Sequence, residues 1–324
     1  MLGILTYFNI HSGSCAPAER DLPSLVTVFS QTLSPPTTRG TVCVEDALVL
    51  AHDPHPGEQW VLRLRAPEIA ARARPGSFVH IQCDATLPMR RPMSIMHADT
   101  SAGTLDILYK VHGLGTRLLA GQVPGKPVSL LGPIGVPFRL DGYRPRPLLI
   151  GGGVGIPPMV FLALHLRRAA KAISPLLLMG SEVPFPFRPR PSQILVSGVP
   201  APVIAAMPLM EDHGIASRLA SLRDFPGCFE GYVTDLARHW IDHQGSAGRA
   251  EVEVFACGPT PMLKAVIALC REYRIPGQVS VEEFMACALG GCAGCTVRVE
   301  TDAGPAMKRV CVDGPVFDAE RVCL

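Results

Sequence analysis

The stretch LLIGGGVGIPPMVFLAL at residues 148–164 decides how the middle of this chain folds. A short apolar run suited to a buried strand leads into a loop with four glycines, and an apolar run of helical length follows. A strand, a glycine turn and a helix in this order begin a parallel α/β sheet. The loop also lets backbone approach a pyrophosphate at the helix N-terminus, although its spacing is not the GxGxxG of a simple dinucleotide fingerprint.

The same region must be compared with a membrane span, because residues 147–164 carry no charged side chain. That length is near the minimum for a transmembrane helix. The glycines and the two adjacent prolines, Pro157 and Pro158, instead indicate a strand, a tight loop and a buried helix. We therefore expect no membrane-spanning segment.

The alternation of strands and helices continues toward the C-terminus. The predicted elements are an apolar strand at residues 175–179, a helix-like stretch around residues 215–222, a strand at residues 252–255 and a helix at residues 261–273. The segment PFPFRPRP, half of it proline, is predicted to be a loop. Ligands bind at the carboxyl ends of parallel strands, and Cys257, Gly258 and Pro259 follow such an end. A core thiol and a tight turn are the alternative interpretations.

Residues 41–140 have a different pattern, with short strand-like runs bounded by Gly, Pro, Asp and His. The runs are QWVLRL at 59–64, SFVHIQ at 77–82, TLDILYKV at 104–111 and PVSLL at 127–131. Several short strands with regular turn signals predict a small antiparallel barrel.

Two motifs in this barrel region favour a diphosphate-bearing flavin. An arginine can pair with a diphosphate, and a nearby hydroxyl or amide can reach the flavin; the first motif is Arg91, Pro92, Met93 and Ser94. A glycine-threonine helix start offers free amides for phosphate; here Leu108, Tyr109 and Lys110 end a strand, and Gly115 and Thr116 follow in a predicted helix. Each piece alone is compatible with an ordinary surface turn, so the interpretation rests on the ordered set.

The strongest chemical signal is a cluster of four cysteines near the C-terminus. Cys287, Cys292 and Cys295 have the spacing C-x4-C-x2-C, and Cys311 follows after fifteen residues. This spacing is associated with plant-type [2Fe–2S] ferredoxins. The small residues between the cysteines let a loop curl around a cluster and direct its amides at sulfur. Val297 and Val299 predict a strand whose partner returns at residues 309–312, which brings Cys311 to the site.

A zinc site and unligated core thiols are the alternatives to a [2Fe–2S] cluster. Zinc ribbons favour paired CxxC knuckles, whereas the second half of this site has a single cysteine. Four cysteines within 25 residues make unligated thiols a poor explanation. The chain has eleven cysteines, an odd number, and clustered free thiols fit a reducing cytoplasm better than a secreted disulfide framework.

Composition limits the remaining possibilities. The 324 residues suffice for two or three domains, and 48% hydrophobic against 18% charged residues indicates a folded globular protein. A net charge of +2, without a basic stripe, does not suggest a nucleic-acid or membrane-surface partner. Residues 1–40 lack the basic flank of a secretory signal and are expected to form a poorly ordered extension.

Taken in order, these motifs resemble the ferredoxin–NADP⁺ reductase superfamily, and more closely the electron transfer subunits of NAD-dependent dihydroorotate dehydrogenase. The resemblance covers residues 41–324, and the ending CVDGPVF at 311–317 separates this family from generic flavin reductases. It implies an FAD-binding barrel of six antiparallel strands (41–143), a Rossmann-like NAD domain with a parallel sheet (144–276) and a small [2Fe–2S] domain (277–324). It implies that FAD is bound by Arg91, Pro92, Met93, Ser94, Leu108, Tyr109, Lys110, Gly115 and Thr116. NAD would face Gly151, Gly152, Gly153, Gly155, Cys257, Gly258 and Pro259, and the cluster ligands would be Cys287, Cys292, Cys295 and Cys311.

The resemblance also implies a partner and a role in pyrimidine (UMP) biosynthesis. In this family electrons from dihydroorotate, oxidised on an FMN-containing catalytic subunit, pass through the cluster and FAD to NAD⁺, and the complex is a heterotetramer with two of each subunit. No catalytic acid–base dyad is expected in the present chain. The proline-rich segment after Glu182 departs from the family pattern where the adenine ribose would lie, so NAD and NADP are not distinguished. A reductase subunit of another complex, such as a ferredoxin:NADP⁺ oxidoreductase, sulfur reductase or hydrogenase, and a non-enzymatic zinc scaffold remain as alternatives.

Overall fold

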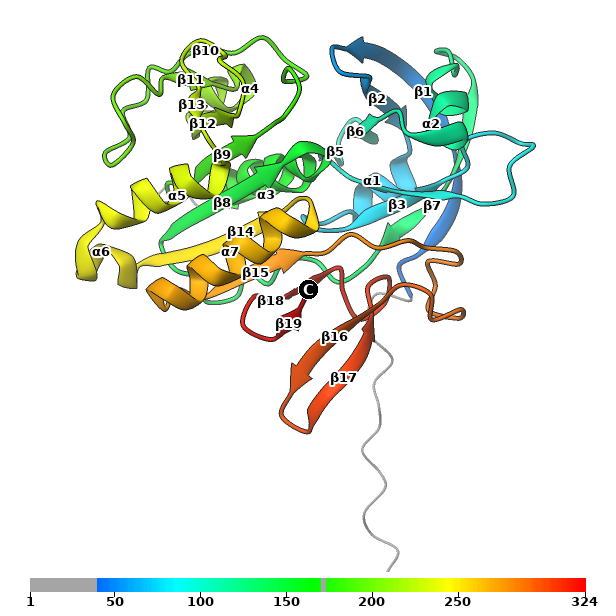
Figure 1. Ribbon diagram of the computed structural model, residues 1–324. Helices are drawn as coiled ribbons and strands as arrows, with labels where there is room; N and C mark the ends of the chain where they lie inside the picture. The colour runs from blue at the N-terminus through cyan, green and yellow to red at the C-terminus, as the bar shows by residue number, and fades with distance from the viewer. Residues whose placement is uncertain (1–39, 170–172) are drawn as a thin grey trace, which may run out of the picture. The chain divides into compact units, whose positions relative to one another are not determined.

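A computed structural model describes residues 40–169 and 173–324 (Figure 1). The expected N-terminal extension at residues 1–40 lies outside this range except for Gly40. Of the helices that the structure describes, none is long and apolar enough to cross a membrane. The uncharged stretch instead forms strand β8 (Arg146–Gly152), turn η1 (Gly153–Gly155) and helix α3 (Ile156–Ala169).

The first part of the chain forms a curled antiparallel sheet of seven strands in the order β4-β3-β7-β1-β2-β6-β5. The strands are β1 (Cys43–His55), β2 (Gln59–Arg65), β3 (Phe78–Ile81), β4 (Arg91–Ser94), β5 (His97–Asp99), β6 (Thr104–Lys110) and β7 (Pro127–Ile134), with helices α1 (Pro67–Arg72) and α2 (Gly113–Ala120) between them. The predicted antiparallel sheet is confirmed. It has one strand more than the predicted six, because the short β5 pairs with β6.

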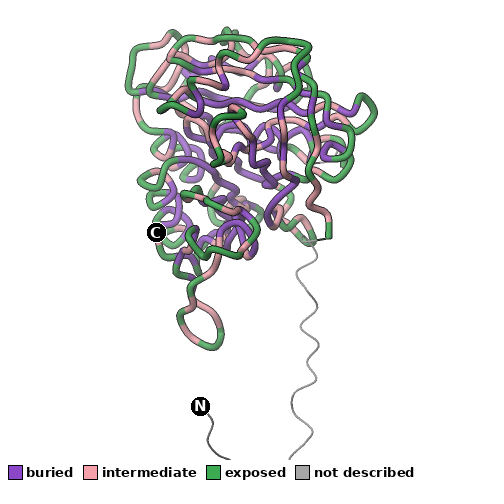
Figure 2. Tube along the Cα trace, turned by 90° about the vertical axis from the view of Figure 1, so that its right-hand side faces the viewer, coloured by how far each residue is buried: buried purple, intermediate pink, exposed green. Residues whose placement is uncertain are grey.

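Alternation along the strands builds the interior of this sheet. Leu62 and Leu64 of β2 are fully buried in one apolar cluster with Leu105 and Ile107 of β6. Successive strand residues point to opposite faces, so alternate positions are left for solvent or for a neighbouring element. Figure 2 shows that the buried positions lie mostly inside the folded chain and the exposed positions mostly at its periphery.

The second sheet also has seven strands, in the order β13-β12-β9-β8-β14-β15-β18. Its remaining strands are β9 (Leu176–Gly180), β12 (Ala216–Ser221), β13 (Phe229–Glu230), β14 (Val252–Cys257), β15 (Gly277–Ser280) and β18 (Val316–Asp318). All neighbours are parallel except β18, which is antiparallel to β15. The predicted parallel α/β sheet is therefore confirmed.

Helices cover both faces of this sheet, and the strand sequence shows why. Leu148 and Ile150 of β8 pack in one cluster with helices α5 (Val233–Asp242) and α7 (Thr260–Tyr273), whereas Leu149 packs in another with α3. A strand with helices on both faces needs apolar residues at successive positions, as β8 has from Pro147 to Gly152. Helix α5 shows the matching one-sided stripe, since its buried residues are Val233, Leu236, Ala237, Trp240 and Ile241.

The prediction of a helix around residues 215–222 is wrong, because this stretch is strand β12. It lies between β9 and β13, and five of its six residues are buried. Its polar side chains bond to nearby backbone: Ser221 Oγ donates to the carbonyl of Ser181, and the buried Arg218 donates through Nη1 and Nη2 to the carbonyls of Ser217 and Ile194. The Nε of Arg218 is buried without a hydrogen-bond partner among the described residues. The helix in this region comes earlier, at α4 (Pro208–Asp212), and the short α6 (Gly245–Ala250) and the β10 (Arg190–Pro191) and β11 (Ala205–Ala206) pair complete the outer elements.

The cysteine-rich segment carries a third, small sheet with the order β17-β16-β19. It contains β16 (Thr296–Thr301), β17 (Gly304–Arg309) and β19 (Val322–Cys323). A strand does return beside β16, but the predicted bounds of 309–312 are wrong: the strand spans Gly304–Arg309 and ends two residues before Cys311. Residues 277–280 and 316–318, on either side of this segment, belong to the large parallel sheet as β15 and β18. The first sheet also contacts the segment directly, because the backbone N–H of Val136 donates to the carbonyl of Gly314.

Candidate functional site

Arg91 and the start of helix α2 come together, as the order of the two motifs suggested. A Cβ added to Gly115 would lie 3.0–3.2 Å from the guanidinium of Arg91, so a larger residue there would displace this side chain by a few tenths of an ångström. Arg91 Nη1 is held by the carbonyls of Met89 and Arg90. Among the described residues no side chain caps α2 at His112. Uncapped amides and a fixed guanidinium make a site for an anion such as a diphosphate.

The rest of the RPMS motif forms strand β4 itself. Met93 is buried in the interior of the first sheet, whereas Pro92 and Ser94 are half-buried on the opposite face. Thr116 lies in the first turns of α2 and is buried; its hydroxyl donates to the carbonyl of His112 and accepts from the His112 N–H. A ligand that binds on the Pro92 and Ser94 face of β4 would therefore contact Ser94 and backbone atoms, and would not contact the buried side chain of Met93.

The predicted residues of β6 divide between two faces. Tyr109 is buried in the sheet interior, where its hydroxyl lies 2.9 Å from His52 Nε2, and burial raises its pKa. Leu108 is buried outside that cluster, and Lys110 is exposed. Strand β6 lies against turn η1, which belongs to the glycine loop. Because the side chain of Tyr109 points into the sheet interior, Tyr109 can offer a ligand on the opposite face only its backbone groups.

The two predicted nicotinamide motifs touch each other. Strands β8 and β14 are parallel neighbours with Gly151 opposite Cys257, so both loops leave the sheet at the same edge. A Cβ added to Gly155 would overlap the backbone of Cys257 and Gly258, and one added to Gly152 would overlap Met262. Gly153 has φ +54°, and no described atom lies within 4 Å of where its Cβ would be. The loop is thus packed on one side and open on the other.

Cys257 lies at the bottom of this edge. It is buried, and burial raises the pKa of its thiol, so the thiol stays protonated at neutral pH. Pro259 is the N-cap residue of α7 and stops the strand from continuing. A dinucleotide at this edge would therefore meet the neutral thiol of Cys257 and the N-terminus of helix α7.

Farther along the same edge there is a cavity of about 580 Å³ lined by aromatic rings and prolines. Phe185 and Phe187 follow β9 and their rings lie 5.4 Å apart, while Phe225 follows β12. Gln59 Nε2 donates to the carbonyls of Pro56 and Pro184, which ties this segment to the β1–β2 turn. The proline-rich segment, predicted to be a loop, is the wall of this cavity.

The four predicted cluster cysteines fall into two pairs. Backbone N–H groups of Leu289 and Cys292 donate to Cys287 Sγ at 3.4 Å, and that of Gly294 donates to Cys292 Sγ at 3.5 Å. Burial opposes ionisation of Cys287, but the N–H groups of Cys292 and Leu289 outweigh it and lower its pKa to about 6. Burial and the neighbouring Cys295 thiol raise the pKa of Cys311 to about 12.

The loop between the cysteines is wound as the small residues predicted. Ala288 and Ala293 both have φ near +54°, and Gly290 has φ +81°. A left-handed alanine costs about 1–2 kcal/mol, so these residues mark a backbone held in an unfavourable shape at a functional site. The two alanines each follow a cysteine directly, and the turn they make exposes amides to sulfur.

The described cysteines of this segment differ in exposure. Cys292 is exposed and Cys287 is half-buried, whereas Cys295 and Cys311 are buried. Among the described residues, no group of three or more His, Cys, Asp or Glu is placed to hold a single metal ion. All ten cysteines in the described part of the chain are free thiols.

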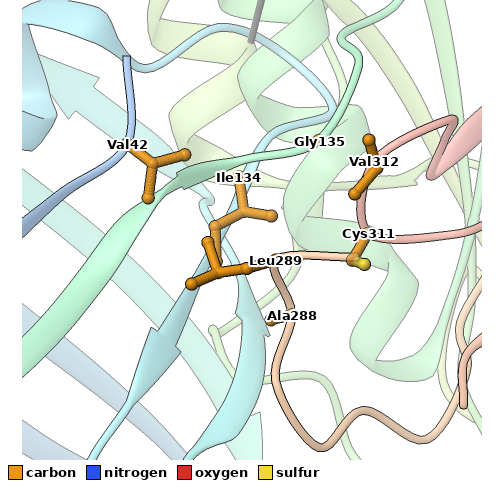
Figure 3. Close-up of a pocket in the computed structure, with 7 residues that line it drawn as sticks. All are labelled: Val42, Ile134, Gly135, Ala288, Leu289, Cys311 and Val312. Atoms are coloured by element: carbon orange, nitrogen blue, oxygen red, sulfur yellow. The ribbon is translucent and has the colours of Figure 1, made fainter. Parts of the chain in front are cut away.

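A cavity of about 230 Å³ joins the cysteine segment to the first sheet (Figure 3). Val42, Ile134 and Gly135 line it from the sheet, and Ala288, Leu289, Cys311 and Val312 line it from the cysteine segment. Val42 and Leu289 could not be recognised as lining residues from their sequence context. Gly135 could have been, because it directly follows β7 and has φ +95°, a conformation that favours glycine. Sequence reasoning also missed Arg309, whose Nη1 donates to the carbonyl of Gly290.

Comparisons with known proteins agree with this arrangement. Residues 282–323 match the family model for the iron-sulfur cluster binding domain of dihydroorotate dehydrogenase B. The dihydroorotate dehydrogenase B (NAD⁺) electron transfer subunit of Desulforamulus reducens is 32% identical, with 86% of this chain and 98% of the relative covered. That of Bacillus caldolyticus is 35% identical, with 78% and 87% covered.

Solved structures share the fold. The chain is similar to an NADH-dependent reduced ferredoxin–NADP oxidoreductase structure, with TM-score 0.63, 21% identity and coverage of 86% of this chain and 90% of the other. A ferredoxin NADP⁺ reductase from Neisseria gonorrhoeae with bound FAD and NADP has TM-score 0.52, 14% identity and coverage of 71% and 91%. The fold, the cysteine segment and the relatives agree: the chain belongs to the family of dihydroorotate dehydrogenase B (NAD⁺) electron transfer subunits.

Proposed function

We propose that this chain transfers electrons between an FMN-containing dihydroorotate dehydrogenase catalytic subunit and NAD⁺, with a [2Fe–2S] cluster and FAD as its own cofactors. The observation that carries the proposal is the cavity in Figure 3, where Cys311 and the edge of the first sheet face the same space. A cluster held by Cys311 and a flavin held by that sheet would be neighbours. Neighbouring redox groups are what an electron transfer subunit needs.

The cofactors supply chemistry that the side chains lack. Flavin exchanges hydride with nicotinamide and single electrons with an iron–sulfur cluster, so it belongs between them. Cys287, Cys292, Cys295 and Cys311 would hold the cluster. The chain needs no acid–base residue for dihydroorotate, because that oxidation belongs to the partner.

For FAD, the chain provides an anion site for the diphosphate and a sheet face against which the flavin would lie. Arg91 and the uncapped start of α2 would bind the diphosphate, with Gly115 giving the guanidinium its space. Pro92 and Ser94 of β4 and the backbone of Leu108 to Lys110 would line the flavin. Met93 and Thr116, whose side chains are buried, would support this site from below.

For NAD, the chain provides a tight edge and an apolar cavity. Gly151, Gly152, Gly153 and Gly155 would let the pyrophosphate approach the start of α3, and Cys257, Gly258 and Pro259 would face the nicotinamide. The cavity lined by Phe185, Phe187 and Phe225 lies beyond the ends of β9 and β12, along the same carboxyl edge. Its rings suit the flat adenine at the other end of the dinucleotide.

The proposed division of labour follows the three segments. Residues 41–143 would bind FAD, residues 144–276 NAD and residues 277–324 the cluster. With its catalytic partner the chain would form a complex with two of each subunit, acting in pyrimidine biosynthesis.

The test is purification of the native complex, followed by metal analysis, a visible spectrum and an assay of dihydroorotate-dependent NAD⁺ reduction. We expect flavin and iron in the chain and activity only in the complex. A preparation with a full complement of zinc, or with neither flavin nor iron, would refute the cofactor assignment. A preparation that contains flavin and iron but has no dihydroorotate-dependent activity would instead indicate a reductase subunit of a different complex.

A further inference from the structure

Arg309 joins the two halves of the cysteine segment. It is the last residue of β17, and it lies opposite Thr296, the residue after Cys295, in the β16–β17 register. Two residues later the chain reaches Cys311. Arg309 therefore lies near both buried cysteines, Cys295 and Cys311, along the backbone of the β16–β17 pair. Its side chain is about one third exposed.

The guanidinium makes two directed contacts. Nη1 donates to the carbonyl of Gly290 at 3.1 Å, and Nε donates to Asp313 Oδ2 at 3.2 Å. The same carboxylate oxygen accepts the backbone N–H of Arg309 at 2.7 Å, and the Asp313 N–H donates to the Arg309 carbonyl. These hydrogen bonds join Arg309 to Asp313 and so close the five-residue turn that contains Cys311.

Gly290 is where this ring reaches the other cysteines. It lies between Cys287 and Cys292, and its own N–H group is directed at Cys311 Sγ. Its φ of +81° is a conformation that other residues adopt only with strain. A contact at the Gly290 carbonyl therefore fixes the loop of the first two cysteines relative to the fourth cysteine.

Charge gives the contact a second effect. The Arg309 guanidinium lies close enough to Cys311 and Cys295 for their charges to interact. A cluster gains negative charge on reduction, so a nearby cation favours the reduced state, and the potentials of such clusters depend on local charge and hydrogen bonds. Asp313 offsets part of this effect, because its carboxylate forms an ion pair with the same guanidinium.

We propose that Arg309 is a positioning residue that clamps the Cys287–Cys295 loop to the Cys311 turn and raises the reduction potential of the cluster. The inference rests on the proposed function, since it requires the cluster. Lysine cannot replace both effects: it keeps the charge but lacks the planar fork that reaches Gly290 and Asp313 together.

The experiment compares full-length variants in the complex with the catalytic subunit. Arg309→Gln removes the charge, Arg309→Lys keeps the charge, and Asp313→Asn removes the opposing carboxylate. The matched control is Arg321→Gln, because Arg321 pairs with Asp302 at the β16–β17 turn, the end of the hairpin away from Cys295. The readouts are the midpoint potential of the cluster, from a redox titration followed by electron paramagnetic resonance, and the rate of iron release to a chelator.

We expect Arg309→Gln to move the midpoint to more negative values and Asp313→Asn to more positive values, with Arg321→Gln at the wild-type value. Arg309→Lys keeps the midpoint near wild type, but iron release is about tenfold faster or more, as the loss of a hydrogen bond to a charged group predicts. An unchanged midpoint in Arg309→Gln, or an equal shift in Arg321→Gln, overturns the proposal. If Arg309→Gln retains no cluster, Arg309→Lys decides, and wild-type iron release in that variant overturns the clamp. A wild-type chain without iron refutes the proposed function instead.

Discussion

Gly155→Ala tests the packing of the two loops that we propose to bind NAD. The added Cβ would lie 2.3 Å from the carbonyl oxygen of Cys257 and 2.4 Å from the backbone nitrogen of Gly258, whereas ordinary contact begins at 3.4 Å. Because both are backbone atoms, no rotamer change relieves the overlap, and one loop must move by about 1 Å. Overpacking of this kind costs about 1–3 kcal/mol, and each kcal/mol lowers Tm by about 2–4 °C in a domain of this size.

The displacement has a larger effect on hydride transfer than on stability. A shift of about 1 Å in a positioning loop can cost about 100-fold in rate. We expect this loss in NADH oxidation with a soluble dye, while flavin content and the iron–sulfur spectrum stay at wild-type levels. The control is Gly245→Ala, which has φ +61° and no described atom within 4 Å of its added carbon. It should lose some stability but keep full activity; equal activity in the two variants would refute the reasoning.

Three other changes give distinct outcomes. Cys292→Ser should keep NADH oxidation with a dye but lose transfer to the catalytic partner, and equal loss of both would indicate a structural role for the cluster. Arg91→Gln should raise the FAD dissociation constant about 10- to 100-fold, as loss of a charge-assisted hydrogen bond predicts, which flavin fluorescence during dialysis measures. Burial and the charge of Arg90 lower the pKa of His80 to about 4 from 6.5, so the unfolded chain binds a proton first as the pH falls. Stability should therefore decrease by about 3 kcal/mol between pH 6.5 and pH 4, and His80→Leu should flatten this dependence in chemical denaturation.

The sequence predicts best those motifs whose residues lie close together in the chain, because their spacing is itself the signal. The C-x4-C-x2-C spacing gave the curled loop, with Ala288 and Ala293 in left-handed conformations, and the return strand brought Cys311 beside Cys295. The glycine loop and Cys257 were expected at the same sheet edge because parallel strands end together, and the register of β8 and β14 places them there.

Contacts between distant segments could not be predicted. Residues 216–221 form a strand because β9 and β13 flank them, and their own alternation of small and polar residues does not distinguish strand from helix. The bond from Arg309 to Gly290 depends on how a hairpin and a loop meet, and a basic residue in a strand carries no sign of it. The aromatic cavity depends likewise on Phe185 and Phe225 approaching from different strand ends.

Because β15 and β18 are paired, the iron–sulfur segment between them could be cut out of the chain without removing a strand from the large sheet. Ser280 and Val316 are direct partners across this antiparallel pair, although the whole cysteine segment lies between them in the chain. A tight turn that joins them would close an ordinary β-hairpin and leave both strands in the sheet. A chain shortened in this way would keep the two parts that we propose to bind FAD and NAD, and another redox module grafted between the same two residues would give an electron another route out of the proposed flavin.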